Sequence, residues 1–129
     1  MTTDQLYKKH PFLFERSELD KNLTCFRGIE CDDGWIDLID QLSTKLTELY
    51  PTIQYEQIKE KFGLLRIYLH GTNDSNWKEI RNIVNYYEEL SLTICETCGE
   101  SDDELVERKL INHWYKTICT KCEGIQNEA

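Results

Sequence analysis

The sequence predicts an α+β fold in which two amphipathic helices pack on a small antiparallel sheet and a C-terminal four-cysteine zinc ribbon follows. Three observations predict it. Two segments carry apolar residues at three- and four-residue steps, two short segments between them alternate apolar and polar residues, and two C-x-x-C pairs lie near the C-terminus. The 129 residues suit one domain with a small appendage, so we place an α+β body over 1–92 and a ribbon lobe, packed on that body, over 93–129.

Composition restricts the classes of function. The chain is 40% hydrophobic and 30% charged, as expected for a globular protein, and its net charge is −9. A negative field of this size disfavours extended binding to nucleic-acid phosphates. The polar N-terminus resembles no signal peptide, and no apolar run approaches the ~18 residues that a membrane helix needs. We therefore expect a cytoplasmic protein, in which cysteines stay reduced.

The first 30 residues carry little pattern. Leu6 and Tyr7 precede Pro11 and predict a short helix, and Phe12 and Phe14 predict an extended segment that packs onto the body. Residues 15–24 show no periodicity and are predicted to be irregular.

A clear helix is predicted from Gly34 to Tyr50, where Pro51 ends it. Asp32 or Asp33 is expected to cap its first turn. Its solvent side is predicted to form an acidic interaction face made of Asp33, Asp37, Asp40 and Glu48.

A hairpin and a second helix follow. Strands are predicted over 53–59 and 64–70 with a turn at the sequence EKFG, and the helix is predicted over 76–90. The helical and strand patterns together predict a core that contains Trp35, Leu38, Leu42, Leu46, Leu65, Ile67, Leu69, Trp77, Ile80, Val84 and Tyr87.

The two C-x-x-C pairs supply four thiolates, which are ligands for one tetrahedral Zn²⁺: Cys95, Cys98, Cys119 and Cys122. Four cysteines leave no open position for water, so a structural ion is favoured over a catalytic one. Strands are predicted over 105–111 and 114–118 between the pairs. His113 lies between the pairs as well, and it is interpreted as a surface residue because four sulfurs already suffice.

The remaining cysteines, Cys25 and Cys31, have no ligand-like spacing and are interpreted as buried free thiols. A nucleophilic Cys31 is disfavoured because the neighbouring acids Glu30, Asp32 and Asp33 would raise its pKa. These acids and the following Asp37 and Asp40 form a cluster of five carboxylates that would suit a Mg²⁺ or Mn²⁺ site, but a solvated helix face is the commoner explanation. A further reading is an acidic stripe that imitates nucleic-acid phosphates and blocks a basic host protein.

A second set of residues forms a possible anion-binding or ligand-binding site, for which a nucleotide-like small molecule is one candidate. Its cations surround the EKFG turn and the start of the second helix: Lys59, Lys61, Arg66, Lys78 and Arg81. Free helix N–H groups beside Lys78 and Arg81 favour an anion there. Pairing of these cations with the surplus carboxylates is the favoured explanation, because exposed charges are weakly constrained.

The segments RGIECDDGWIDLIDQL, QIKEKFGLLRIYLHG, ICETCGE and WYKTICTKC, together with HPFLFERS, resemble a family of small phage- and prophage-encoded proteins. In that family an ECxDGW segment opens a helix, a KEKxGxLRxY hairpin follows, and two zinc knuckles end the chain. The resemblance covers nearly the whole chain and implies a phage or mobile-element origin, without an activity.

Three functions are predicted, in this order. The first is a non-catalytic, zinc-stabilised protein that binds and inhibits a host protein, for example in a defence system. The second is sequestration of an anionic small molecule such as a signalling nucleotide. The third is nucleic-acid binding through the zinc ribbon. An enzyme is not expected, because no phosphate-binding glycine loop, G-x-S-x-G, H-E-x-x-H or dinucleotide fingerprint occurs.

Overall fold

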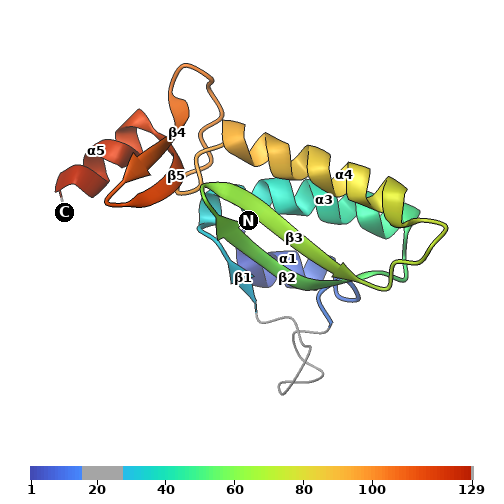
Figure 1. Cartoon of the computed structure of the whole chain (residues 1–129). Coiled ribbons are helices and arrows are strands. Elements are labelled where there is room, and N and C mark those ends of the chain that lie inside the picture. The colour runs from blue at the N-terminus through green and yellow to red at the C-terminus, as the bar shows by residue number, and fades with distance from the viewer. Residues whose placement is uncertain (16–27, 129) are drawn as a thin grey trace.

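The computed structural model describes residues 1–15 and 28–128 and has the α+β architecture that the sequence predicts. Figure 1 shows a body, in which helices α3 and α4 run side by side along a small sheet, and a smaller lobe at the C-terminal end. We call the described residues up to 92 the body and residues 93–128 the ribbon lobe. Among the described residues, no helix is both long enough and apolar enough to cross a membrane.

The N-terminal segment forms helix α1 (Thr3–Lys9), which confirms the predicted short helix. Thr2 and Gln5 cap it reciprocally, because the Thr2 side chain accepts from the Gln5 N–H and the Gln5 side chain accepts from the Thr2 N–H. Residues 11–15 form turns rather than the expected extended segment. The irregular stretch predicted over 15–24, and Cys25 after it, lies outside the described residues from position 16 onward.

The first long helix begins with a 3₁₀ turn, η1 (Asp33–Trp35), and continues as α3 (Ile36–Leu49). The predicted side-chain cap from Asp32 or Asp33 is wrong. The residue before η1, Asp32, makes no capping hydrogen bond with its side chain. Instead the N–H groups of Asp32 and Gly34 donate to Glu96 of the ribbon lobe, so another part of the chain satisfies the start of this helix.

The body sheet has the order β1–β2–β3. Strands β2 (Gln54–Lys61) and β3 (Leu64–His70) form the predicted antiparallel hairpin, while the two-residue strand β1 (Ile29–Glu30) pairs with β2 in parallel and was not predicted. Phe62 and Gly63 make the turn with positive φ angles of 56° and 79°. This left-handed geometry matches the twist of a two-residue hairpin.

The edge of β3 is covered by side chains of α4 (Trp77–Leu90) and of the 3₁₀ turn η2 (Ser91–Thr93). The Ile67 N–H donates to the Glu88 carboxylate at 2.9 Å, and the Leu65 N–H donates to the Ser91 hydroxyl at 3.0 Å. Glu88 therefore lies against the helix dipole because it is a buried acceptor for a strand edge.

The core confirms eight of the eleven predicted residues as buried. Leu69 and Tyr87 are only partly buried against it. Trp77 is 48% exposed, because α4 begins at this residue and its side chain lies at the rim of a surface hollow. Several core residues come from segments that sequence periodicity did not mark, among them Leu6, Phe14 and Tyr55.

The ribbon lobe contains the predicted antiparallel pair, β4 (Val106–Ile111) and β5 (Trp114–Cys119), joined by a turn at Asn112 and His113. A further helix, α5 (Thr120–Glu128), was not predicted, since its sequence lacks apolar periodicity.

Candidate metal centre

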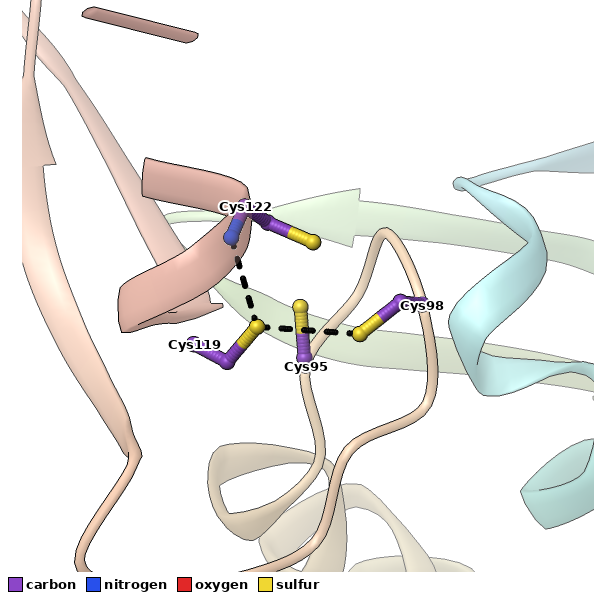
Figure 2. Close-up of side chains that lie close together, drawn as sticks. All are labelled: Cys95, Cys98, Cys119 and Cys122. Atoms are coloured by element: carbon purple, nitrogen blue, oxygen red, sulfur yellow. Dashed lines mark hydrogen bonds between the residues drawn. The ribbon is translucent and has the colours of Figure 1, made fainter. Parts of the chain in front are cut away.

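Two pieces of the ribbon lobe supply the four predicted ligands. Cys95 and Cys98 lie in the loop after η2, while Cys119 ends β5 and Cys122 lies in the first turn of α5. Figure 2 shows the four sulfur atoms turned toward a common space. The structure thus brings together all four cysteines that the spacing selects.

The sulfur geometry fits a tetrahedral ion. All four Sγ atoms lie within 4.8 Å of one another, and Cys98 Sγ lies 3.6 Å from Cys119 Sγ. Metal–sulfur bonds of about 2.3 Å place tetrahedral sulfurs about 3.8 Å apart, whereas a disulfide requires about 2.05 Å. The cysteines are free thiols in this arrangement.

The electrostatics of the cluster favour a cation. Burial acts to raise the pKa of Cys119, but the Cys122 N–H and the neighbouring thiols donate to its sulfur and lower the pKa to about 7. Burial and the neighbouring sulfurs raise the pKa of Cys122. A divalent ion at this position would allow all four sulfurs to be thiolates.

Gly34 docks the first knuckle onto the body. Its N–H donates to the Glu96 carbonyl at 2.7 Å, and a Cβ at this position would lie 2.1 Å from the Cys95 carbonyl oxygen. The neighbouring Trp35 Nε1–H donates to the Ile94 carbonyl at 2.8 Å. Only glycine permits this close approach between η1 and the loop that carries Cys95 and Cys98.

Glu96 joins three segments. Its side chain is 7% exposed and accepts from the Asp32 N–H at 3.1 Å, and its own N–H donates to the Thr117 carbonyl at 3.0 Å. Burial raises the pKa of this carboxyl. The sequence offered no signal for this role, because Glu96 lies between two metal-ligand candidates and local patterns do not show which distant groups it meets.

The β2–β3 turn docks the second strand of the ribbon. The Thr117 hydroxyl donates to the Gly63 carbonyl at 2.6 Å, and a Cβ on Gly63 would lie 3.3 Å from the Thr117 nitrogen. The ECDDGW and KEKFG segments thus both contact the lobe that carries the cysteines.

The predicted cations lie in two groups. Lys59 and Arg66 are cross-strand partners, and Lys61 follows on the same face of the hairpin. Across the edge of β3, Lys78 lies 5.6 Å from the Trp77 ring, and Arg81 forms an ion pair of 2.7 Å with Glu88. Arg81 therefore has the internal carboxylate partner that the sequence analysis favoured.

A hollow of about 240 Å³ is lined by residues of β2, β3 and α4. Tyr68 and Trp77, both about half exposed, line it together with Arg81, Ile80, Val84 and Glu56. The Lys59 Nζ lies 5.6 Å from the centre of the Tyr68 ring. Aromatic surfaces with cations beside them thus flank the hollow.

The predicted acidic face is only partly free. Asp33, Asp37 and Glu48 are exposed. Asp40 is not, because its carboxylate lies 2.8 Å from His10 Nε2 and 3.0 Å from Lys9 Nζ. The buried His10, which sequence reasoning missed, thereby ties α1 to α3.

The remaining predicted residues, His113 and Cys31, lie outside the four-sulfur cluster. His113 is exposed in the β4–β5 turn. Cys31 is a partly buried free thiol whose pKa is raised by burial and by the neighbouring acids, first Glu96.

Comparison of the chain with protein-family models, curated proteins and solved structures gives no match, so the site is interpreted from its own chemistry.

Proposed function

We propose that this chain is a non-catalytic binding protein whose ribbon lobe is assembled around one structural Zn²⁺. The four-sulfur cluster carries this proposal, since thiolates in tetrahedral arrangement are the ligands of structural zinc and fill its coordination sphere. The contacts of Gly34 and Thr117 with the opposite part of the chain support a scaffold role. An ion in this position would fix the lobe to the body.

Native mass spectrometry of the purified chain tests the zinc. One zinc ion per chain is expected, and Cys98→Ser should lose it. Cys31→Ser is the matched control because Cys31 lies outside the four-sulfur cluster, and it should retain full occupancy. A metal-free wild-type chain, or one with a disulfide between these positions, would contradict the proposal.

The surface beside β3 supports an anionic, nucleotide-like ligand. Tyr68 and Trp77 line the hollow, and the Nζ atoms of Lys59 and Lys78 lie over their rings, 5.6 Å from the ring centres. A base can stack on an aromatic ring while its phosphate takes the adjacent cation. Arg81 is held by Glu88, so we assign it to shaping the hollow rather than to the phosphate.

Calorimetry of the zinc-loaded chain against a nucleotide panel tests this ligand class. We expect Tyr68→Ala and Lys78→Glu each to weaken binding, whereas Lys45→Glu, an equal charge change on the exposed side of α3, should not. The absence of heat with every nucleotide would remove the ligand proposal and leave the zinc proposal intact.

Inhibition of a host protein is the second candidate. The exposed Asp33 and Asp37 near the ribbon lobe support it, as does the resemblance to phage-encoded proteins. With such an origin we expect the chain to act in the cytoplasm of a host cell. Purification of a host complex that Asp33→Lys and Asp37→Lys abolish, and that a change outside the acidic face, Asp74→Lys, leaves intact, is the expected result. A complex insensitive to all three changes would exclude the acidic face.

A further inference from the structure

The hairpin presents cations on the side of the sheet away from the core. Because Ile58, Leu65 and Ile67 are buried, strand alternation turns the other side chains outward, and we call these six the outer sheet face: Gln57, Lys59, Lys61, Leu64, Arg66 and Tyr68. None of the six is acidic, although the chain carries a net charge of −9.

Three acids border this face. Glu30 of β1 is the register partner of Lys59, Glu56 at the far end lies 3.7 Å from His70, and the Glu60 carboxylate accepts from the Gly63 N–H at the turn. The cations Lys59, Lys61 and Arg66 lie between these acids on the outer sheet face.

The turn carries this face onto the ribbon lobe. Phe62 at the turn is 58% exposed, and its ring centre lies 6.5 Å from that of Tyr115 on β5. The Arg108 guanidinium lies 4.5 Å from the Tyr115 ring, and Lys61 lies 5.6 Å from the Phe62 ring. The bond from Thr117 to Gly63 holds turn and ribbon together, so the arrangement is built into the fold.

We propose that this surface binds single-stranded nucleic acid. Bases would stack on the rings of Tyr68, Phe62 and Tyr115. Lys59 and Arg108 lie over the Tyr68 and Tyr115 rings, and together with Arg66, the register partner of Lys59, they would take phosphates. This inference rests on the proposed nucleotide-like ligand and extends its site from the hollow, across the outer sheet face, to the ribbon lobe.

Charge and shape select a single strand over a duplex. Bases that are unpaired expose ring faces, and stacking on aromatic side chains tolerates any sequence. A duplex hides those ring faces inside its base stack. Its phosphates would also extend beyond the cations of the outer sheet face and approach the acidic remainder of the chain. The prediction that net charge disfavours nucleic acid therefore applies to duplexes, while the local distribution of charge favours a short single strand.

Fluorescence anisotropy with labelled oligothymidylates tests the proposal on the full zinc-loaded chain. Oligomers of about 4 to 16 nucleotides cover the usual site sizes of such surfaces. We expect affinity to rise with length to a plateau, to fall with added salt, and to exceed that for a duplex of equal length.

Single substitutions test which side chains contact the bound single strand. Tyr115→Ala and Arg108→Glu are each expected to weaken binding of the longer oligomers about tenfold while mononucleotide binding stays unchanged. Phe62→Asn removes the ring but suits the positive φ at this position, so the turn should survive. Lys45→Glu on α3 is the control for the change in net charge.

The outcomes separate this inference from the proposed function. Mononucleotide binding without a gain from chain length, or without an effect of Arg108→Glu and Tyr115→Ala, would overturn the inference alone. If the wild-type chain binds no nucleotide of any length, both this inference and the proposed nucleotide-like ligand are overturned. Equal binding of duplex, or a sedimentation result showing that Phe62 and Tyr115 instead join two copies of the chain, would also overturn it.

Discussion

In the body, sixteen buried apolar side chains from α1, α3, α4, the sheet and the segments between them form one cluster among the described residues. The corresponding cluster of the ribbon lobe has six members, and three of those are metal-site cysteines. Val106, Ile111 and Ile118 supply the rest. Segments of this size usually need a metal or disulfides to stay folded. The body is therefore held mainly by apolar burial and the lobe by its cysteines.

The body and the ribbon lobe are nevertheless joined by hydrogen bonds, most of which involve backbone groups. Gly34, Glu96 and Thr117 make hydrogen bonds that cross between them. Such bonds require fixed geometry on both sides. We infer that loss of the metal would release the lobe from the body without dissolving the body core.

Metal removal should have the largest effect. Structural zinc contributes on the order of 10 kcal/mol to small metal-bound modules. After chelation, hydrogen exchange should accelerate throughout residues 95–122 while α3 and the β2–β3 hairpin remain protected. Equal acceleration in both regions would show that the body also depends on the ion, and unchanged exchange would show that the lobe does not.

Gly34→Ala tests the contact between the regions. The added methyl would overlap the Cys95 and Glu96 carbonyl oxygens, so we expect a loss of about 3 kcal/mol, the upper end for overpacking. Denaturant unfolding measures it. Gly124→Ala is the control, because a Cβ there would meet no atom within 4 Å apart from the adjacent backbone, and alanine should stabilise α5 slightly.

Glu88→Ala tests the body alone. The substitution leaves the Ile67 N–H and the Arg81 guanidinium without their carboxylate, which we expect to cost about 2 kcal/mol. The exposed Glu89 provides a matched control on the same helix. Zinc occupancy should stay complete in both variants. A chain that loses zinc with Glu88→Ala would show that the two regions are more tightly coupled than proposed.

The Asp40 contacts predict a small dependence on pH within the body. Burial acts to raise the pKa of Asp40, but hydrogen bonds from His10 and Lys9 outweigh it and lower the pKa. The unfolded chain then binds more protons, so this stabilisation is complete above the ordinary carboxyl pKa of about 3.9 and is lost as the pH falls through the folded pKa.

The unfolding free energy of the wild type should exceed that of Asp40→Asn by about 1 kcal/mol at neutral pH, and the difference should shrink near pH 3. Comparison of the two chains by urea unfolding cancels the loss of metal that acid causes in both. The exposed Asp37→Asn should show no such trend. A difference between wild type and Asp40→Asn that grows on acidification would contradict the assignment.

The same division between body and lobe explains what the sequence could predict. The helix α3, the β2–β3 hairpin and α4 follow from local periodicity, and the four cysteines follow from spacing alone. Local patterns carry no information on which distant groups meet, so Glu96 and Thr117 were missed. Trp77 was placed in the core because periodicity marks a helix face but not where that face extends past the sheet. Helix α5 and strand β1 were missed because one lacks periodicity and the other has two residues.

X-ray absorption spectroscopy at the zinc edge tests the central claim most directly. Freshly purified chain should show zinc with four sulfur neighbours at about 2.3 Å. Oxygen or nitrogen among those neighbours, or an absence of zinc, would contradict a closed ion that joins the two cysteine pairs.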